Sequence, residues 1–214
     1  LPVRNAGGEY LARHGRGYTR FEHARAGIAL DLLQFVPGDE SIKVSRLRLR
    51  NLSGRTRHLT LTVYVEWVLG TSRSATAPFV ATEIDPVTGG MLARNLWGGM
   101  DGRVAFTDLG GLQTAWTGNR TEFVGRNGTL ERPAALVAGA TLSGRTGAGL
   151  DPCGALQVTV VLAANASIEL VWLLGAAPST QAAQALIERW RVQDIDAALQ
   201  VVRASWSNVL DAVT

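Results

Sequence analysis

The chain has 214 residues, of which 46% are hydrophobic and 18% charged, so it can bury a sizeable core and disorder is excluded as the default state. Its net charge of +3 comes from 21 basic and 18 acidic residues scattered along the sequence, which gives no support to nucleic acid as a partner. The length suits one main domain better than two.

The single cysteine, Cys153, excludes an internal disulfide and metal sites built on thiolate pairs, and it fits a reducing compartment. No apolar run reaches the roughly 18 residues of a membrane span, and the N-terminus does not have the pattern of a signal peptide. We therefore expect a cytoplasmic location, or the cytoplasmic side of a membrane-anchored enzyme. The absence of an initial methionine suggests a piece of a longer polypeptide.

Strands are predicted first at residues 18–24 and 28–36, followed by a turn and then by the most strongly patterned stretch, residues 43–69. Within it, apolar residues recur at every second position from Leu59 to Trp67, and residues 51–56 carry turn chemistry. This pattern predicts a β-hairpin with one buried face. Because a lone hairpin is marginal in water, a second sheet must cover it, which implies a sandwich.

Further strands are expected after a polar loop at residues 71–78. They occupy residues 79–84, 91–96, 104–106, 155–163 and 167–174. Residues 116–132 are predicted to be the longest irregular segment, and the all-β part ends near Gly175.

The hydrophobic period changes from two to three or four after Pro178, which predicts two amphipathic helices. Ser179 or Thr180 caps the first helix, and Asp194 caps the second. Their apolar faces must dock on the sandwich or on a following domain. The stripe of the second helix also predicts either pairing with a second copy of the chain, as a homodimer, or mobile ends.

No catalytic or metal motif is visible. The histidines His14, His23 and His58 lack the spacing of zinc ligands, and neither a nucleophile elbow nor a phosphate-binding loop is present. The sequence indicates no metal and no cofactor.

Arg20 and Glu22 share one face of a predicted strand, where they form either a solvated ion pair or a polar platform for a sugar or a second domain. Trp97 and Trp116 differ from the other tryptophans because both lie near glycines in predicted loops. An exposed indole stacks well on a pyranose ring, whereas the alternative is ordinary packing against the domain itself.

Three long stretches together resemble one family: residues 13–22 (RHGRGYTRFE), 64–70 (YVEWVLG) and 119–128 (NRTEFVGRNG). They are similar to the N-terminal β-domain of glycoside hydrolase family 94, formerly glycosyltransferase family 36. The cyclic β-1,2-glucan synthetase branch is the most similar, and cellobiose phosphorylase is a further member. The resemblance covers nearly the whole chain.

This resemblance implies a mainly β fold, a galactose mutarotase-like β-supersandwich over residues 1–177. It also implies two linker helices at residues 178–214 that lead towards an absent (α/α)6 barrel. The catalytic aspartate and the phosphate-binding residues of the family belong to that barrel. The chain is therefore expected to be non-catalytic, to support the barrel of the same polypeptide and to share in binding a β-glucan oligosaccharide.

On this reading the loop at residues 70–78 reaches towards the barrel. Arg73 then helps to hold glucan, with Ser72 beside it; the alternative is an exposed connector. Two other functions stay open. An autonomous carbohydrate-binding module requires Trp97 and Trp116 exposed on one surface, and a mutarotase requires an acid and a base in one cleft. His23 and Glu22 are a poor pair for the latter, because neighbouring strand residues face opposite ways.

Overall fold

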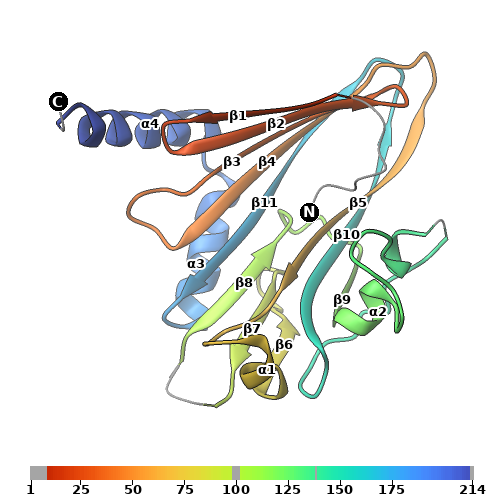
Figure 1. The fold of residues 1–214 in the computed structure, drawn as a ribbon, viewed down its shortest axis with the longest axis vertical. Helices are drawn as coiled ribbons and strands as arrows, with labels where there is room; N and C mark the ends of the chain where they lie inside the picture. Colours follow the sequence, from red (N-terminus) through yellow and green to blue (C-terminus); the bar gives the residue numbers. More distant parts are fainter. Residues whose placement is uncertain (1–8, 98–101, 138, 213–214) are drawn as a thin grey trace.

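The chain folds into two antiparallel β-sheets with helices on their outer sides, as described by a computed structural model of residues 9–97, 102–137 and 139–212 (Figure 1). The large sheet has eight strands in the order β1 (Tyr10–Gly15), β2 (Tyr18–Arg25), β3 (Ile28–Phe35), β4 (Ile42–Asn51), β11 (Ser167–Ala177), β8 (Val104–Asp108), β7 (Met91–Asn95) and β6 (Val80–Ile84). The small sheet has the order β5 (Arg57–Glu66), β10 (Pro152–Leu162) and β9 (Ala115–Asn119). The predicted sandwich is confirmed.

The hairpin predicted at residues 43–69 is wrong, because its two strands lie in different sheets. β4 pairs with β3 and β11 in the large sheet, whereas β5 pairs with β10 in the small one. The next pair in sequence, β10 and β11, is divided between the sheets in the same way. A period of two shows that one face of a strand is buried, but it does not show which strand lies beside it.

Asn51 lies where the connections from β4 to β5 and from β10 to β11 pass between the two sheets, and its side chain is fully buried. Its Nδ2 group donates to the carbonyl oxygens of Arg55 (2.7 Å), Leu162 (3.1 Å) and Ala163 (2.9 Å), and its Oδ1 accepts from the Ser53 backbone N–H (3.0 Å). The two crossings are therefore tied together by one amide.

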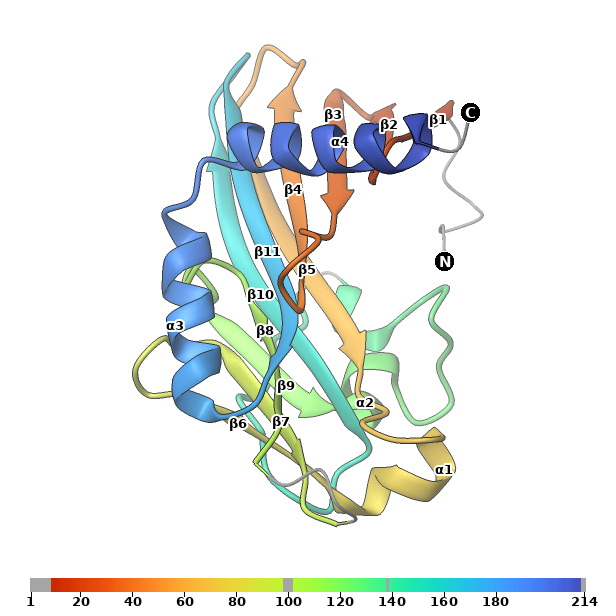
Figure 2. The same ribbon diagram turned by 90° about the vertical axis from the view of Figure 1, so that its left-hand side faces the viewer.

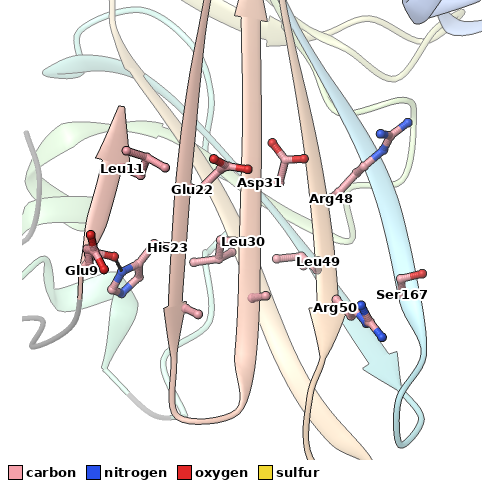
Figure 3. Close-up of a pocket in the computed structure, with 12 residues that line it drawn as sticks. Glu9, Leu11, Glu22, His23, Leu30, Asp31, Arg48, Leu49, Arg50 and Ser167 are labelled. Atoms are coloured by element: carbon pink, nitrogen blue, oxygen red, sulfur yellow. Dashed lines mark hydrogen bonds between the residues drawn. The ribbon is translucent and has the colours of Figure 1, made fainter. Parts of the chain in front are cut away.

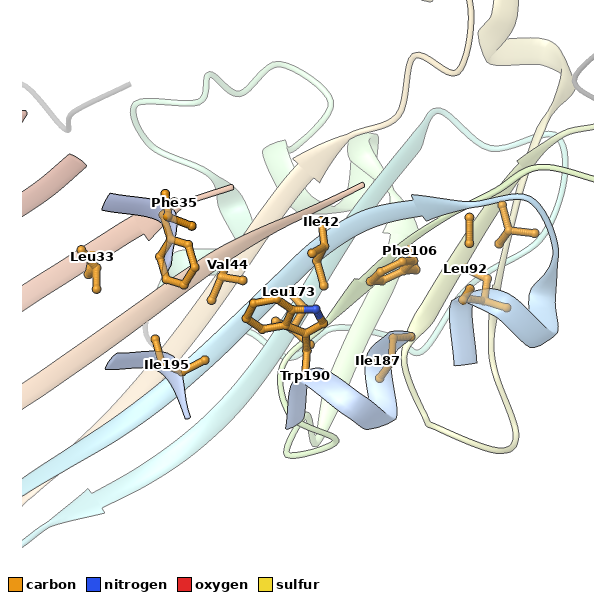
Figure 4. Close-up of a cluster of buried hydrophobic side chains, with 14 residues drawn as sticks. Leu33, Phe35, Ile42, Val44, Leu92, Phe106, Leu173, Ile187, Trp190 and Ile195 are labelled. Atoms are coloured by element: carbon orange, nitrogen blue, oxygen red, sulfur yellow. The ribbon is translucent and has the colours of Figure 1, made fainter. Parts of the chain in front are cut away.

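Aliphatic residues from both sheets form the core between them. Its most buried members include Leu156, Met91, Leu109, Leu49 and Leu170. A second cluster covers the outer face of the large sheet, where Trp190 and Ile187 pack near Phe106, Val44 and Phe35 (Figure 4).

The outer cluster exists because α3 (Thr180–Arg191) lies along β11 and β8. Ser179 caps this helix by accepting from the Ala182 N–H (3.2 Å), so the first of the two predicted caps is confirmed. The Arg191 guanidinium makes two hydrogen bonds to the fully buried carboxylate of Asp108, at 3.0 and 2.6 Å. Gln184 donates to Asp85 (2.8 Å). The helix is thus part of the packed body.

The second helix, α4 (Ile195–Asp211), begins at the predicted cap Asp194 and crosses the strands from β4 to β1 (Figure 2). Ile195 and Val202 are buried against the large sheet. Gly17, at φ +78°, lies under the Trp206 indole, yet 47% of Trp206 stays exposed. The expected apolar surface on this helix is therefore present.

Six short or exposed elements were not predicted. β1 is exposed along its whole length and so lacks alternation. The segment expected to be irregular contains β9 and α2 (Arg120–Val124), and the polar loop contains α1 (Arg73–Thr76) and a 3-10 turn (Ala77–Phe79). A further 3-10 turn is Ala134–Leu136.

The Arg191 contact predicts a large stability effect. Arg191→Met leaves the buried Asp108 carboxylate without its cation, so we expect the free energy of unfolding to fall by about 3–5 kcal/mol. The control is Arg189→Met in the same helix, whose half-exposed guanidinium pairs with Glu40; its expected loss is below about 1 kcal/mol. Urea unfolding followed by tryptophan fluorescence measures both, and equal losses would contradict the assignment.

Candidate functional site

Arg73 and Ser72 lie at the start of α1, at one end of the small sheet. The Ser72 hydroxyl caps the helix by accepting from the Ala75 N–H (3.3 Å). The Arg73 guanidinium turns back onto its own domain, where it pairs with Asp151 and lies 3.3 Å from both Glu66 Oε2 and the Pro152 carbonyl oxygen. Its donors are therefore largely used within the chain.

These contacts belong to a cluster of two carboxylates and two guanidinium groups, here called the Glu66 cluster. Its members are Glu66, Arg73, Arg120 and Asp151. Arg120 Nε donates to Glu66 Oε1 at 2.8 Å and its NH1 lies 3.7 Å from Asp151, while the Tyr64 hydroxyl also donates to Glu66 at 2.8 Å. Sequence reasoning found only Arg73. Glu66 lies seven positions from Arg73, Arg120 and Asp151 come from two distant segments, and no sequence motif marks any of the three.

Burial raises the pKa of Glu66, but hydrogen bonds from Arg120 and Tyr64 outweigh it and hold that pKa below its ordinary value. The carboxylate is therefore ionised at neutral pH. A general acid must keep its proton at the working pH, so Glu66 is unsuited to that role.

The structure confirms that Arg20 and Glu22 share a face of β2, and it adds Asp31 from β3. The Arg20 guanidinium binds both Asp31 oxygens, at 2.7 and 2.6 Å, and lies 3.6 Å from Glu22. Arg13 on β1 pairs with Glu22 as well. The predicted Arg–Glu pair is thus one part of an ion network over three strands.

This network borders a hollow of about 610 Å³ on the large sheet (Figure 3). Leu11, Glu22, Asp31 and Arg48 form one cross-strand row along it, because each is the register partner of the next. Carboxylates and a guanidinium offer acceptors and donors to sugar hydroxyls or to a polar protein surface. The ion pairs that Arg20 and Glu22 form therefore lie beside this hollow.

The two loop tryptophans lie in different surroundings. Trp97 is 69% exposed and its ring stacks on Phe79, with centroids 5.4 Å apart. Trp116 lies in β9 opposite the buried Leu156, packs against the core between the sheets and donates its Nε1–H to Gly144 (3.1 Å). Only Trp97 has an indole largely open to a ligand.

Nucleophilic and acid–base groups are not gathered elsewhere in the described residues. Burial, with the nearby Asp151 carboxylate, raises the pKa of the Cys153 thiol to about 12, so this thiol stays protonated. His23 stacks on Tyr10 and bonds to the Glu9 carbonyl oxygen, on the opposite side of β2 from Glu22. No described group of three or more His, Cys, Asp or Glu residues is placed to hold a metal ion.

The Glu66 cluster predicts a specific pH dependence. Because the folded pKa of Glu66 lies below its unfolded value of about 4.3, the stabilisation is complete above that value and is lost as the pH falls through the folded pKa. The Tm of Glu66→Gln should lie below that of the wild type at neutral pH, and the two should converge in acid. Glu131→Gln, at an exposed position, is the control. A Tm difference independent of pH would contradict the prediction.

Comparison with known proteins gives a consistent result. The model of the family described as "Glycosyl hydrolase 94, supersandwich domain" matches residues 1–193. The cyclic β-(1,2)-glucan synthase NdvB of Rhizobium meliloti (strain 1021) is 34% identical over 205 residues, which are 95% of this chain but 7% of NdvB. Solabiose phosphorylase of Paenibacillus borealis is 28% identical over 197 residues, 88% of this chain and 25% of that enzyme.

A solved bacterial glucoamylase complexed with acarbose shares the fold. It superposes with a TM-score of 0.60 at 7% identity, over 97% of this chain and 29% of the glucoamylase chain. None of the described helices has the length and apolar character to cross a bilayer. On the family match, which extends from the first strand through α3, the chain belongs to the glycosyl hydrolase 94 supersandwich-domain family.

Proposed function

We propose that the chain is the non-catalytic supersandwich domain of a larger carbohydrate-active enzyme, of the glycoside phosphorylase or cyclic β-1,2-glucan synthetase type. The observation that carries the proposal is the family match over residues 1–193, in a chain that spans only 7% and 25% of its two curated relatives. Chemistry in such an enzyme belongs to the part outside this chain.

The site geometry supports a non-catalytic role. Glycoside cleavage needs one carboxylic acid that keeps its proton and a second group that attacks or activates an attacker. The carboxylates of the Glu66 cluster and of the Arg20 network are instead paired with arginines. Ion pairs of this kind hold segments of the chain together.

Support of the catalytic barrel is the second part of the proposal. The helical segment, residues 178–214, starts with α3, which is held to the sandwich by the hydrogen bonds between Arg191 and Asp108. It continues into α4, which leaves four large apolar residues exposed: Val201, Trp206, Val209 and Leu210. A rigid body followed by an apolar helix suits docking onto the (α/α)6 barrel of the same polypeptide. Without the barrel, the same surface would pair two copies of the chain. The free, buried Cys153 agrees with a cytoplasmic location.

Glucan contact is the third part, and the candidates are Arg73, Ser72, Trp97, Trp116, Arg20 and Glu22. Trp97 is the strongest, because most of its indole is exposed while the Arg73, Arg20 and Glu22 groups have partners within the chain. The binding-module alternative loses its main support, since Trp116 packs into the sandwich core.

The non-catalytic role predicts no turnover by this chain alone. The 214-residue chain and the longer polypeptide are incubated separately with β-1,2-glucan and phosphate, and glucose 1-phosphate is assayed. We expect product only from the longer polypeptide, with circular dichroism showing that the short chain is folded. Turnover by the folded short chain, free of host enzymes, would overturn the proposal.

Glucan contact by Trp97 predicts a defect in the longer polypeptide. Trp97→Ala should raise KM for β-1,2-glucan about 5- to 30-fold, the range that follows from losing one or two kcal/mol of binding. Leu96→Ala is the matched control, because Leu96 is the next residue and equally exposed at 67%. Equal KM values for both variants would remove Trp97 from the glucan site.

A further inference from the structure

The strand β5 has one paired edge and one open edge. All ten of its residues pair with β10, and its other edge has no backbone partner among the described residues (Figure 1). Its sequence, RHLTLTVYVE, has charges at the two ends, but no proline and no charged residue from Leu59 to Val65. Natural sheets protect exposed edges with lysine, proline or bulges, and β5 has none of these along its centre.

The large sheet extends beyond this open edge, and none of the described strands covers it there. Phe21 is opposite Leu32 in the register, and Leu32 is opposite Leu47, so the three side chains share the face that looks towards the small sheet. Leu32 and Leu47 line an apolar pocket of about 190 Å³ between the sheets, together with Leu61 of β5. Phe21, one strand further out, is 40% exposed.

Tyr10 extends the same uncovered surface. It is opposite His23, which is opposite Leu30, and Leu30 packs into the core between the sheets. Tyr10 is nevertheless 51% exposed. An open strand edge and an uncovered apolar face therefore adjoin each other, which is the arrangement left when a strand is missing from a sheet.

We propose that the open edge of β5 accepts a β-strand from the same polypeptide, supplied by a segment outside residues 1–214. Its backbone would extend the small sheet, and its inward side chains, apolar at every second position, would cover Phe21 and Leu32. The inference rests on the proposed function, because only a longer polypeptide can supply the strand, and the two curated relatives are far longer than this chain.

A second copy of the chain is a poorer occupant. If two copies pair through antiparallel β5 strands, a two-fold axis perpendicular to the small sheet relates them. The large sheets of both copies then lie on the same side of the combined small sheet. The two overhanging parts of the large sheets, each carrying β1 and β2, would then compete for one space. A single added strand meets no such conflict.

The test uses the full-length polypeptide with the photo-crosslinking residue p-benzoyl-phenylalanine at position 21, a close replacement for Phe21. After irradiation, mass spectrometry of a mixture of light and heavy isotope-labelled protein identifies the linked peptides. We expect links from position 21 to a segment outside residues 1–214 of the same molecule. Their yield should be at least ~10-fold above that of a control label at Val161, which is exposed on β10.

Links confined to residues 1–214, or links between light and heavy chains, would overturn the proposal. Hydrogen exchange of the unmodified polypeptide gives a second measurement that needs no variant: both alternating sets of β5 amides should be protected, and free exchange of one set would also overturn it. The glucose 1-phosphate assay on the same preparation separates the two proposals. Active enzyme without the expected links refutes only the added strand, whereas links in an inactive protein refute only the proposed function.

Discussion

The buried amide of Asn51 holds the point at which the chain twice leaves one sheet for the other. The strands on either side of that point pair with each other, β4 with β11 at the centre of the large sheet and β5 with β10 at one side of the small one. The registers of the two sheets are therefore not independent, because each pair is connected through the same corner. The Asn51 amide stabilises the fold because its own groups and the carbonyl oxygens around it are all hydrogen-bonded. Without it, those buried carbonyl oxygens would lack a donor, and the cost of their desolvation would lower the free energy of unfolding.

A second constraint decides which helix belongs to the sandwich. Three carboxylates, Glu40, Asp85 and Asp108, lie on separate segments, and all three accept hydrogen bonds from side chains of α3. The helix therefore covers the apolar cluster on the outer face of the large sheet, and these three hydrogen bonds hold it in position. α4 has the Arg46–Asp196 ion pair near its start, but its later turns keep much of their apolar surface exposed. The two helices thus differ in kind, one being structural and the other open to a neighbour.

Local chemistry was readable from the sequence, and long-range pairing was not. Strand period and helix caps depend on residues a few positions apart, so β10, β11 and the caps Ser179 and Asp194 were predicted well. The pairing of β5 with β10, and the Glu66–Arg120 and Arg73–Asp151 contacts of the Glu66 cluster, join residues more than 50 positions apart. Trp97 and Trp116 both lie near glycines in the sequence, yet Trp97 follows the end of β7 and is exposed, whereas Trp116 lies within β9 and packs against the core.

The division of neighbouring strands between two sheets has a consequence for biosynthesis. The hydrogen bonds between β4 and β11, for example at the Arg50–Ser167 pair, cannot form until β11 has been synthesised. Those of β5 likewise require β10. As the chain leaves the ribosome, the first half therefore presents unsatisfied strand edges until residues 152–177 emerge. Non-local sheets of this kind form slowly and are exposed to aggregation in the meantime. Because of this strand order, both sheets can assemble only after β10 and β11 have been synthesised.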